Sequence, residues 1–360
     1  MKCTDNREER SFYTEREWAR LQAKEKEEKK HLIKLGLILA GLAVLCGALV
    51  FMVYYFVLRS HDYDLFLPYE NTSPVYGFSS SLQAGSTDTP FADGLCVTDG
   101  DKNTNLLTLN SYSAGLFDLN GREVVYAKDI FTRRSPASIT KIMTALLTLK
   151  YGNLDELVTV TSIVKDIEYG SSVCDIKEGD VLSLKQLLYG MMIASGNDAS
   201  MMIAEYIGGS VDNFVAMMNE EAASLGATGT HFTNPHGLTD SEHYTTVYDI
   251  YLIFQEALKY DLFRDIINRK NYYAEYKRLD GSDVAVTWES TNHYFTNEAE
   301  APEDITVFGG KTGTTDDAGA CLALMTKDLY GNPYLSIILH SETKDSLYSE
   351  MNELLSMIEN

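Results

Sequence analysis

The sequence predicts an α+β fold in which an antiparallel sheet is flanked by helices, with a helical subdomain and one N-terminal transmembrane helix. Three observations predict this class. In residues 113–127 apolar and polar residues alternate as they do in strands. In the middle of the chain the apolar residues recur at helical spacing, and residues 305–341 contain three short strand-like runs. Strands at the two ends of the body with helices between them favour one sheet, in which the first hairpin joins the last three strands.

The composition is that of an ordinary globular protein. The chain has 360 residues, of which 45% are hydrophobic and 23% are charged. This length allows one large domain or two modest ones. The 30 Lys and Arg residues against 52 Asp and Glu residues give a net charge of −22. So acidic a chain is not expected to bind nucleic acid, because phosphate-backbone binding needs basic surfaces.

Residues 35–58 form a run of 24 residues without charge. As a helix this run crosses a hydrocarbon core of about 30 Å. It is longer than the apolar region of a signal peptide, and it ends in large aromatic residues rather than in a cleavage site. Ten Lys and Arg residues precede it, and none occurs between Arg59 and Lys102. By the positive-inside rule we expect a cytoplasmic tail at residues 1–34, a single-pass anchor at 35–58 and an exported body.

The exported part begins with a segment that has no sustained periodicity. Residues 60–103 are rich in Ser, Thr, Asp, Gly, Asn and Pro, which is typical of a stalk. We therefore expect an extracytoplasmic stalk at 60–103 and one catalytic domain at 104–360. The part from residue 60 onward holds 19 basic and 44 acidic residues, a balance of −25.

The first elements of the body are a hairpin and a helix. Alternating apolar residues at 113–119 and 122–127 flank Asn120-Gly121, which is the strongest short hairpin signal. Residues 135–152 then read as a helix, because a proline stands in its first turn, apolar residues recur at helical spacing and Gly152 follows the last turn.

The middle and the end of the chain complete the pattern. Residues 182–208 read as two apolar helices broken near Ser195, and residues 212–226 read as a third, amphipathic helix. The three strand-like runs that follow are separated by turns, and an amphipathic helix closes the chain. The exported cysteines are Cys96, Cys174 and Cys321, so at least one of them is unpaired within the monomer, and a Cys96–Cys174 disulfide stays possible.

Three short motifs carry the chemistry: Ser138-x-x-Lys141, Ser195-x-Asn197 and Lys311-Thr312-Gly313. The first two patterns recur elsewhere in the chain, so each of them alone is weak evidence for a catalytic site. The other copies are Ser162-x-x-Lys165, Ser341-x-x-Lys344 and Ser290-x-Asn292. The Lys-Thr-Gly tripeptide occurs once, on a predicted strand. The three motifs in this order indicate a serine acyl-transfer enzyme.

Context distinguishes the copies of Ser-x-x-Lys. A lysine three residues after a serine faces it only on a helix, and it loses its proton near neutrality only when it is desolvated or lies near another positive charge. Ser138 opens an apolar helix, so we expect Lys141 to be buried. Ser162 lies in a short interrupted segment, and Ser341 precedes a polar-faced helix, where N-capping explains it better.

On these residues the chain resembles the serine D-alanyl-D-alanine carboxypeptidases, the low-molecular-mass penicillin-binding proteins. The resemblance covers about residues 105–342, including the segments TNPHGLTDSEHYTT and KTGTTDDAGACLAL. It implies a serine β-lactamase/DD-peptidase-like fold and a place in the bacterial cell membrane. It also implies two partners: peptidoglycan stem peptides that end in D-Ala-D-Ala, and β-lactams. The N-terminal helix is expected to replace the C-terminal anchor of many members.

The resemblance implies catalytic roles for three side chains. Ser138 is the nucleophile that becomes acylated, Lys141 is the base that takes its proton, and Ser195 passes a proton to the leaving amine. The backbone N–H groups of Ser138 and Thr314 form the oxyanion hole. No cofactor and no metal are implied.

The resemblance also implies substrate-binding roles. The Asn197 amide hydrogen-bonds the peptide backbone of the substrate. Lys311 and Thr312 bind its terminal carboxylate, and Gly313 lets the substrate strand lie close to the sheet edge.

Other functions remain as alternatives. A β-lactamase needs a deacylating group such as the glutamate of Glu-x-x-Leu-Asn, which does not occur between Ser195 and Lys311. A non-enzymatic penicillin or muropeptide sensor would be acylated once, but a 34-residue tail is too small for a folded signalling domain. A zinc peptidase is disfavoured, because His231, His236 and His243 form no His-Glu-x-x-His motif.

Overall fold

The computed structural model describes residues 94–358 and six isolated positions before residue 42. Apart from those six positions, the structure does not describe the predicted tail, the predicted anchor at 35–58 or most of the predicted stalk. Within the described part, none of the helices has the length and the apolar character that a bilayer span requires. The chain divides into two units, Met1–Ser86 and Thr87–Asn360. The elements below all belong to the second unit.

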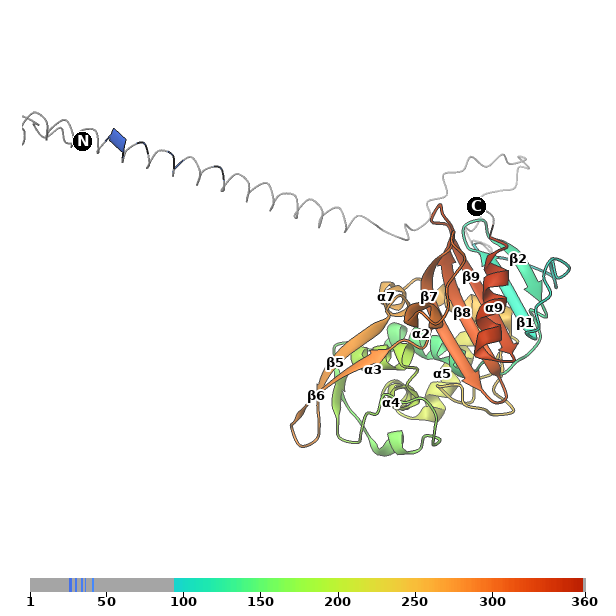
Figure 1. Cartoon of the computed structure of the whole chain (residues 1–360). Helices are drawn as coiled ribbons and strands as arrows, with labels where there is room; N and C mark the ends of the chain where they lie inside the picture. The colour runs from blue at the N-terminus through green and yellow to red at the C-terminus, as the bar shows by residue number, and fades with distance from the viewer. Residues whose placement is uncertain are drawn as a thin grey trace, which may run out of the picture. The chain divides into compact units, whose positions relative to one another are not determined.

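The main sheet has five antiparallel strands in the order β2-β1-β9-β8-β7 (Figure 1). The strands are β1 (Ser113–Asp118), β2 (Glu123–Lys128), β7 (Thr306–Thr315), β8 (Gly319–Lys327) and β9 (Pro333–Ser341). The hairpin β1–β2 therefore joins the three C-terminal strands, with β1 next to β9. The predicted α+β class and this joining of the two chain ends are confirmed.

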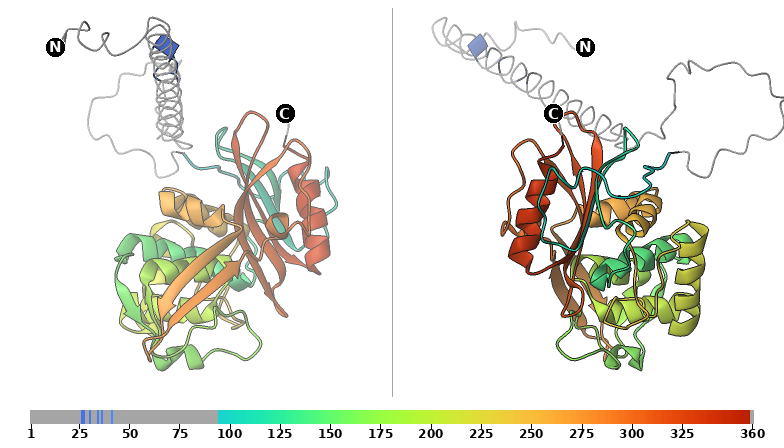
Figure 2. Two further views of the ribbon diagram at one scale, coloured as in Figure 1. Left: turned by 60° about the vertical axis from the view of Figure 1, so that its left-hand side comes forward. Right: turned by 90° about the vertical axis from the view of Figure 1, so that its right-hand side faces the viewer.

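Helices cover both faces of the main sheet. Helix α9 (Lys344–Leu355) packs on one face against β8 and β9, and α6 (Val247–Ala257) packs on the other face against β1 and β9, as the right-hand view of Figure 2 shows. Seven consecutive residues of β8 are therefore buried. This double cover explains why β8 reads as a continuous apolar run rather than an alternating one.

The helical subdomain is built around α2 (Lys141–Tyr151), whose first eight residues are all buried. It contacts the neighbouring helices from several sides. The other helices of this part are α3 (Leu184–Ile193), α4 (Asn197–Gly208), α5 (Val211–Ser224) and α7 (Asp261–Ile267). The break between α3 and α4 falls where the sequence predicts it, at Ser195.

A second sheet of four strands was not identified from the sequence. Its order is β3-β4-β5-β6, made of β3 (Leu157–Thr159), β4 (Val181–Ser183), β5 (Asn271–Lys277) and β6 (Asp283–Glu289). Strands β3 and β4 have three residues each, which is too short for a period of two to be recognised. Strand β6 is followed by α8 (His293–Thr296), whose Tyr294 belongs to the hydrophobic cluster that includes residues of β8.

The segment at residues 94–103 packs on the body, although the sequence places it in the stalk. Cys96 is 1% exposed and its N–H donates to the Tyr251 hydroxyl (2.7 Å). Gln255 donates to the Gly94 carbonyl (3.1 Å), and Lys102 pairs with Ala127. All three described cysteines are buried free thiols. The possible Cys96–Cys174 disulfide is therefore not formed.

Candidate active site

Ser138 lies in η2 (Ala137–Thr140), a single 3₁₀ turn that precedes α2. The sequence predicts one continuous helix from Pro136. The structure differs because Ala137 has a φ of +47°, a conformation that costs a non-glycine residue of order 1–3 kcal/mol. The turn exposes part of Ser138 at the surface of an otherwise buried segment. Strained backbone of this kind is common at catalytic residues.

The segment that follows α5 supports this turn from behind. Gly237 has a φ of +89°, and a Cβ atom on it would lie 1.8 Å from the Ala137 carbonyl oxygen. Thr140 donates to the same carbonyl (2.8 Å), and His243 Nε2 lies 2.8 Å from the Thr140 hydroxyl. Two features require glycine at position 237. Its backbone is left-handed, and the Ala137 carbonyl leaves no space for a side chain.

Lys141 follows the turn and is fully buried. Its Nζ donates to Ser138 Oγ (2.8 Å), Asn197 Oδ1 (2.7 Å) and the His236 carbonyl (2.9 Å). Burial, and then the positive charge of Lys311, lower the pKa of Lys141 well below its usual range. Asn197 Oδ1 and the carbonyl can only accept hydrogen bonds. A neutral Lys141 donates its two protons to them and turns its lone pair to Ser138.

Ser195 and Lys311 form a second contact beside this pair. Ser195 has a φ of +60° in the link between α3 and α4, and it is 5% exposed. Lys311 on β7 is 1% exposed, and its Nζ donates to Ser195 Oγ (3.0 Å) and to the Thr312 carbonyl (2.9 Å). Burial lowers the pKa of Lys311 to about 7. Lys311 therefore changes charge near neutral pH.

The next residues of β7 run along the η2 turn that carries Ser138. A Cβ atom on Gly313 would lie 2.9 Å from both the Pro136 carbonyl oxygen and the Ser138 nitrogen, so β7 approaches the turn closely only because residue 313 is glycine. Thr312 Oγ1 lies 2.5 Å from Thr291 Oγ1. Thr314 is exposed at the rim.

A cavity of about 100 Å³ connects these residues. Five of the residues predicted from the motifs line it: Ser138, Ser195, Thr312, Gly313 and Thr314. Lys141 and Lys311 do not line the cavity but contact Ser138 and Ser195, and Asn197 contacts Lys141. The structure thus brings all eight predicted site residues together.

Another part of the cavity wall was not predicted from the sequence. Its members come from outside the three motifs, and they are Ser172, Thr291, His293, Cys321, Lys344, Leu347 and Tyr348. The repeated motifs in the sequence already pointed to two of these residues. Thr291 lies inside the second copy of Ser-x-Asn, and Lys344 ends the third copy of Ser-x-x-Lys.

The other two Ser-x-x-Lys copies lack the geometry of Ser138 and Lys141. Lys165 is exposed and forms an ion pair with Glu178. Ser341 is buried and donates to Glu350 (3.0 Å), so the prediction that Ser341 is an N-cap is wrong. Thr343 caps α9 instead, through a capping box with Ser346.

The three clustered histidines have separate contacts. Burial lowers the pKa of His236 to about 3 and that of His243 to about 4, so both are neutral at pH 7. The His231 ring contacts the Glu242 carbonyl (2.6 Å). In the part of the chain that the structure describes, no three His, Cys, Asp or Glu side chains gather as a metal site would require.

Comparison with known proteins points to one enzyme family. A family model for D-alanyl-D-alanine carboxypeptidase, Peptidase S11, matches residues 100–343. The chain is 34% identical over 251 residues to the D-alanyl-D-alanine carboxypeptidase DacF of Bacillus subtilis, which is 69% of this chain and 62% of that protein. It is 33% identical over 213 residues to DacA of Escherichia coli strain K12, which is 57% of this chain and 50% of that protein. The chain thus spans between half and two thirds of these relatives.

Two solved structures share the fold. The crystal structure of the Streptomyces K15 DD-transpeptidase aligns with a TM-score of 0.65 at 29% identity, covering 70% of this chain and 97% of that one. The D-alanyl-D-alanine carboxypeptidase DacD of Francisella tularensis aligns with a TM-score of 0.61 at 26% identity, covering 76% of each chain.

Proposed function

Since the chain belongs to the D-alanyl-D-alanine carboxypeptidase family, we propose that it removes the terminal D-alanine of peptidoglycan stem peptides through an acyl-enzyme on Ser138. The contact between Lys141 Nζ and Ser138 Oγ carries the proposal. A serine hydroxyl is a weak nucleophile until a nearby base takes its proton. A buried lysine with a lowered pKa is such a base.

Acylation begins when neutral Lys141 takes the proton of Ser138. The Ser138 oxygen attacks the carbonyl carbon between the two D-alanines, and negative charge develops on the carbonyl oxygen. The backbone N–H groups of Ser138 and Thr314 stabilise that oxyanion. The Asn197 amide and the Thr312 hydroxyl hold the substrate backbone and its terminal carboxylate.

The leaving group departs when the C–N bond breaks. Ser195 gives its proton to the leaving amine, and Lys311 restores that proton to Ser195, to which it already donates a hydrogen bond. Terminal D-alanine leaves. In deacylation a water molecule adds to the ester carbonyl, and its proton returns to Lys311 by way of Ser195. Lys141 gives its proton back to Ser138 as the C–O bond breaks. Every proton is accounted for without a cofactor.

The proposed place of the reaction rests on the sequence. The uncharged run at 35–58 and the basic residues before it support an N-terminal anchor in the bacterial cell membrane, with the tail in the cytoplasm. The catalytic domain then works outside the membrane, where peptidoglycan lies. Protease protection in intact cells tests this orientation: cleavage of the domain by external protease is expected, and its full protection would contradict the orientation.

Labelling with penicillin tests the nucleophile. We expect the full chain to form a stable covalent adduct that mass spectrometry assigns to the peptide holding Ser138. Ser138→Ala should abolish the adduct. Ser162→Ala is the matched control, because it removes the serine of another Ser-x-x-Lys copy, and it should leave labelling unchanged.

An adduct on Ser162 or Ser341 would contradict the assignment. Continuous hydrolysis of penicillin, with no adduct retained, would favour the β-lactamase alternative. A stable adduct on Ser138 without any release of D-alanine from peptides would favour the sensor.

A further inference from the structure

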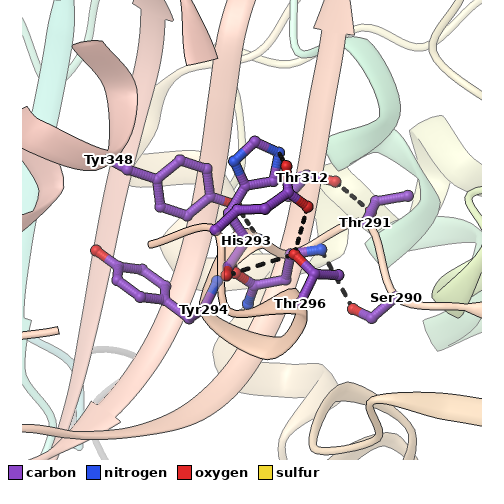
Figure 3. Close-up of polar contacts among 9 residues, drawn as sticks. Ser290, Thr291, His293, Tyr294, Thr296, Thr312 and Tyr348 are labelled. Carbon is purple, nitrogen blue, oxygen red and sulfur yellow. Dashed lines mark hydrogen bonds and ion pairs between the residues drawn. The ribbon is translucent and has the colours of Figure 1, made fainter. Parts of the chain in front are cut away.

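One wall of the cavity comes from residues that carry no catalytic motif. Segment 290–293 follows β6, and helix α9 lies beside it. Together they contribute Thr291, His293 and Tyr348 to the lining. Figure 3 shows these side chains gathered beside Thr312 of β7. The contacts within this cluster lead from α9 to the Thr312 hydroxyl.

The direction in which the Thr312 hydroxyl points depends on its hydrogen bond with Thr291. The two Oγ1 atoms lie 2.5 Å apart, so one hydroxyl donates to the other (Figure 3). A hydroxyl has one proton to donate. If Thr291 is the donor, the Thr312 oxygen accepts, and its own proton is free to point into the cavity. Only in this arrangement can Thr312 donate to a substrate carboxylate while its bond with Thr291 is kept.

Tyr348 holds the segment that carries Thr291. It is 5% exposed, and its hydroxyl accepts from the His293 backbone N–H (2.8 Å) and donates to Asn292 Oδ1 (3.3 Å). The His293 ring stacks on the Tyr348 ring, with the centroids 4.7 Å apart and an angle of 3° between the ring planes. One buried phenol therefore fixes the two residues that directly follow Thr291.

We propose that Tyr348 and Thr291 are positioning residues for substrate recognition: Tyr348 anchors segment 290–293 to α9, and Thr291 orients the Thr312 hydroxyl toward the terminal carboxylate. This inference rests on the proposed function, because it assigns Thr312 to that carboxylate. It extends the function by making α9, the last helix of the described fold, part of the selection of a free carboxyl end.

The position of the cluster determines which kinetic constant responds. The hydrogen bond between Thr291 and Thr312 is separate from the hydrogen bond between Lys141 and Ser138. Disturbing the first of these bonds should weaken substrate binding while leaving proton transfer at Ser138 intact. Substrates without a terminal carboxylate should not respond, because they do not use the Thr312 proton.

Steady-state kinetics of the full chain test the proposal. The probes are a peptide ending in D-Ala-D-Ala and an ester whose leaving group has no carboxylate. Thr291→Val and Tyr348→Phe should each raise KM for the peptide about tenfold and change kcat less than about twofold, as expected when one hydrogen bond to a charged group is lost. Ester hydrolysis should be unchanged. Thr291→Ser, which keeps the hydroxyl, should restore KM.

Tyr294→Phe is the matched control. Tyr294 is also buried and packs on Tyr348, but its hydroxyl donates to Asn352 on α9 (2.7 Å) rather than to segment 290–293. It should leave KM near the wild-type value. An unchanged KM in Thr291→Val, or an equal loss for peptide and ester, would overturn the proposal. If the wild-type chain releases no D-alanine at all, the proposed function fails instead, so the two failures are distinguishable.

Discussion

Two buried lysines divide the proton chemistry of the site. The pKa of Lys141 is lowered by burial and also by the charge of Lys311, whereas that of Lys311 is lowered by burial alone, to about 7. The proposed mechanism needs Lys141 to lose its proton before Lys311 does, so that a neutral base lies beside a charged lysine. Between the two titrations the site holds a neutral base and a charged proton donor. That state is the one the proposed mechanism uses.

This order of titration predicts a bell-shaped pH profile of kcat/KM. Activity should rise with pH as Lys141 becomes neutral, because only the neutral amine can take the Ser138 proton. It should fall as pH passes about 7, because Lys311 then loses the proton that it supplies through Ser195. Initial rates of D-alanine release, measured on both sides of about pH 7, follow both limbs. A rate that still increases well above pH 8 would show that Lys311 works without its charge.

At the scale of elements, the η2 turn that carries Ser138 owes its shape to a distant segment. Ala137 keeps a positive φ because Gly237 packs against its carbonyl and Thr140 donates to the same oxygen. The strain of η2 is thus balanced by packing with residues about one hundred positions later. The turn aims Ser138 at Lys141 only while that packing lasts.

Substituting Gly237 should disable the turn. Gly237→Ala meets the Ala137 carbonyl oxygen at 1.8 Å and also forces alanine into a left-handed backbone. We expect a loss of more than about 3 kcal/mol in the free energy of unfolding and at least a tenfold slower acylation by penicillin. Urea unfolding and labelling kinetics measure the two effects.

Gly331→Ala is the control for backbone strain alone. Gly331 has a similar φ, +86°, but its Cβ position is open, and it lies in the turn between β8 and β9. It should cost only about 1 kcal/mol and leave acylation unchanged. Equal effects of the two substitutions would refute the role of the Gly237–Ala137 contact.

The elements that the sequence predicts are those with a strong local signal. The hairpin has Asn120-Gly121 between alternating strands, and α2 to α5 have long apolar periodicity. The second sheet lacks such a signal, because β3 and β4 contain three residues each. The motif residues of the site are likewise local, whereas Thr291 and Tyr348 lie apart in the chain and are brought to Thr312 only by folding. No spacing rule predicts that meeting.

At the scale of the whole molecule, the catalytic body is acidic while its site is built on lysines. The part of the chain from residue 60 onward carries a balance of −25, yet the proposed substrate ends in a carboxylate. In the state that the proposed mechanism uses, Lys141 is neutral and Lys311 provides the local positive charge against the field of the body. Lys344 adds a second cation at the cavity wall.

The most direct test of the account is the release of D-alanine by the full chain from a peptide ending in D-Ala-D-Ala. We expect many equivalents of D-alanine per enzyme molecule, and none above background from Ser138→Ala. Ser162→Ala should match the wild type. A single equivalent without turnover, or undiminished release by Ser138→Ala, would contradict the claim that this chain is a serine carboxypeptidase acting through Ser138.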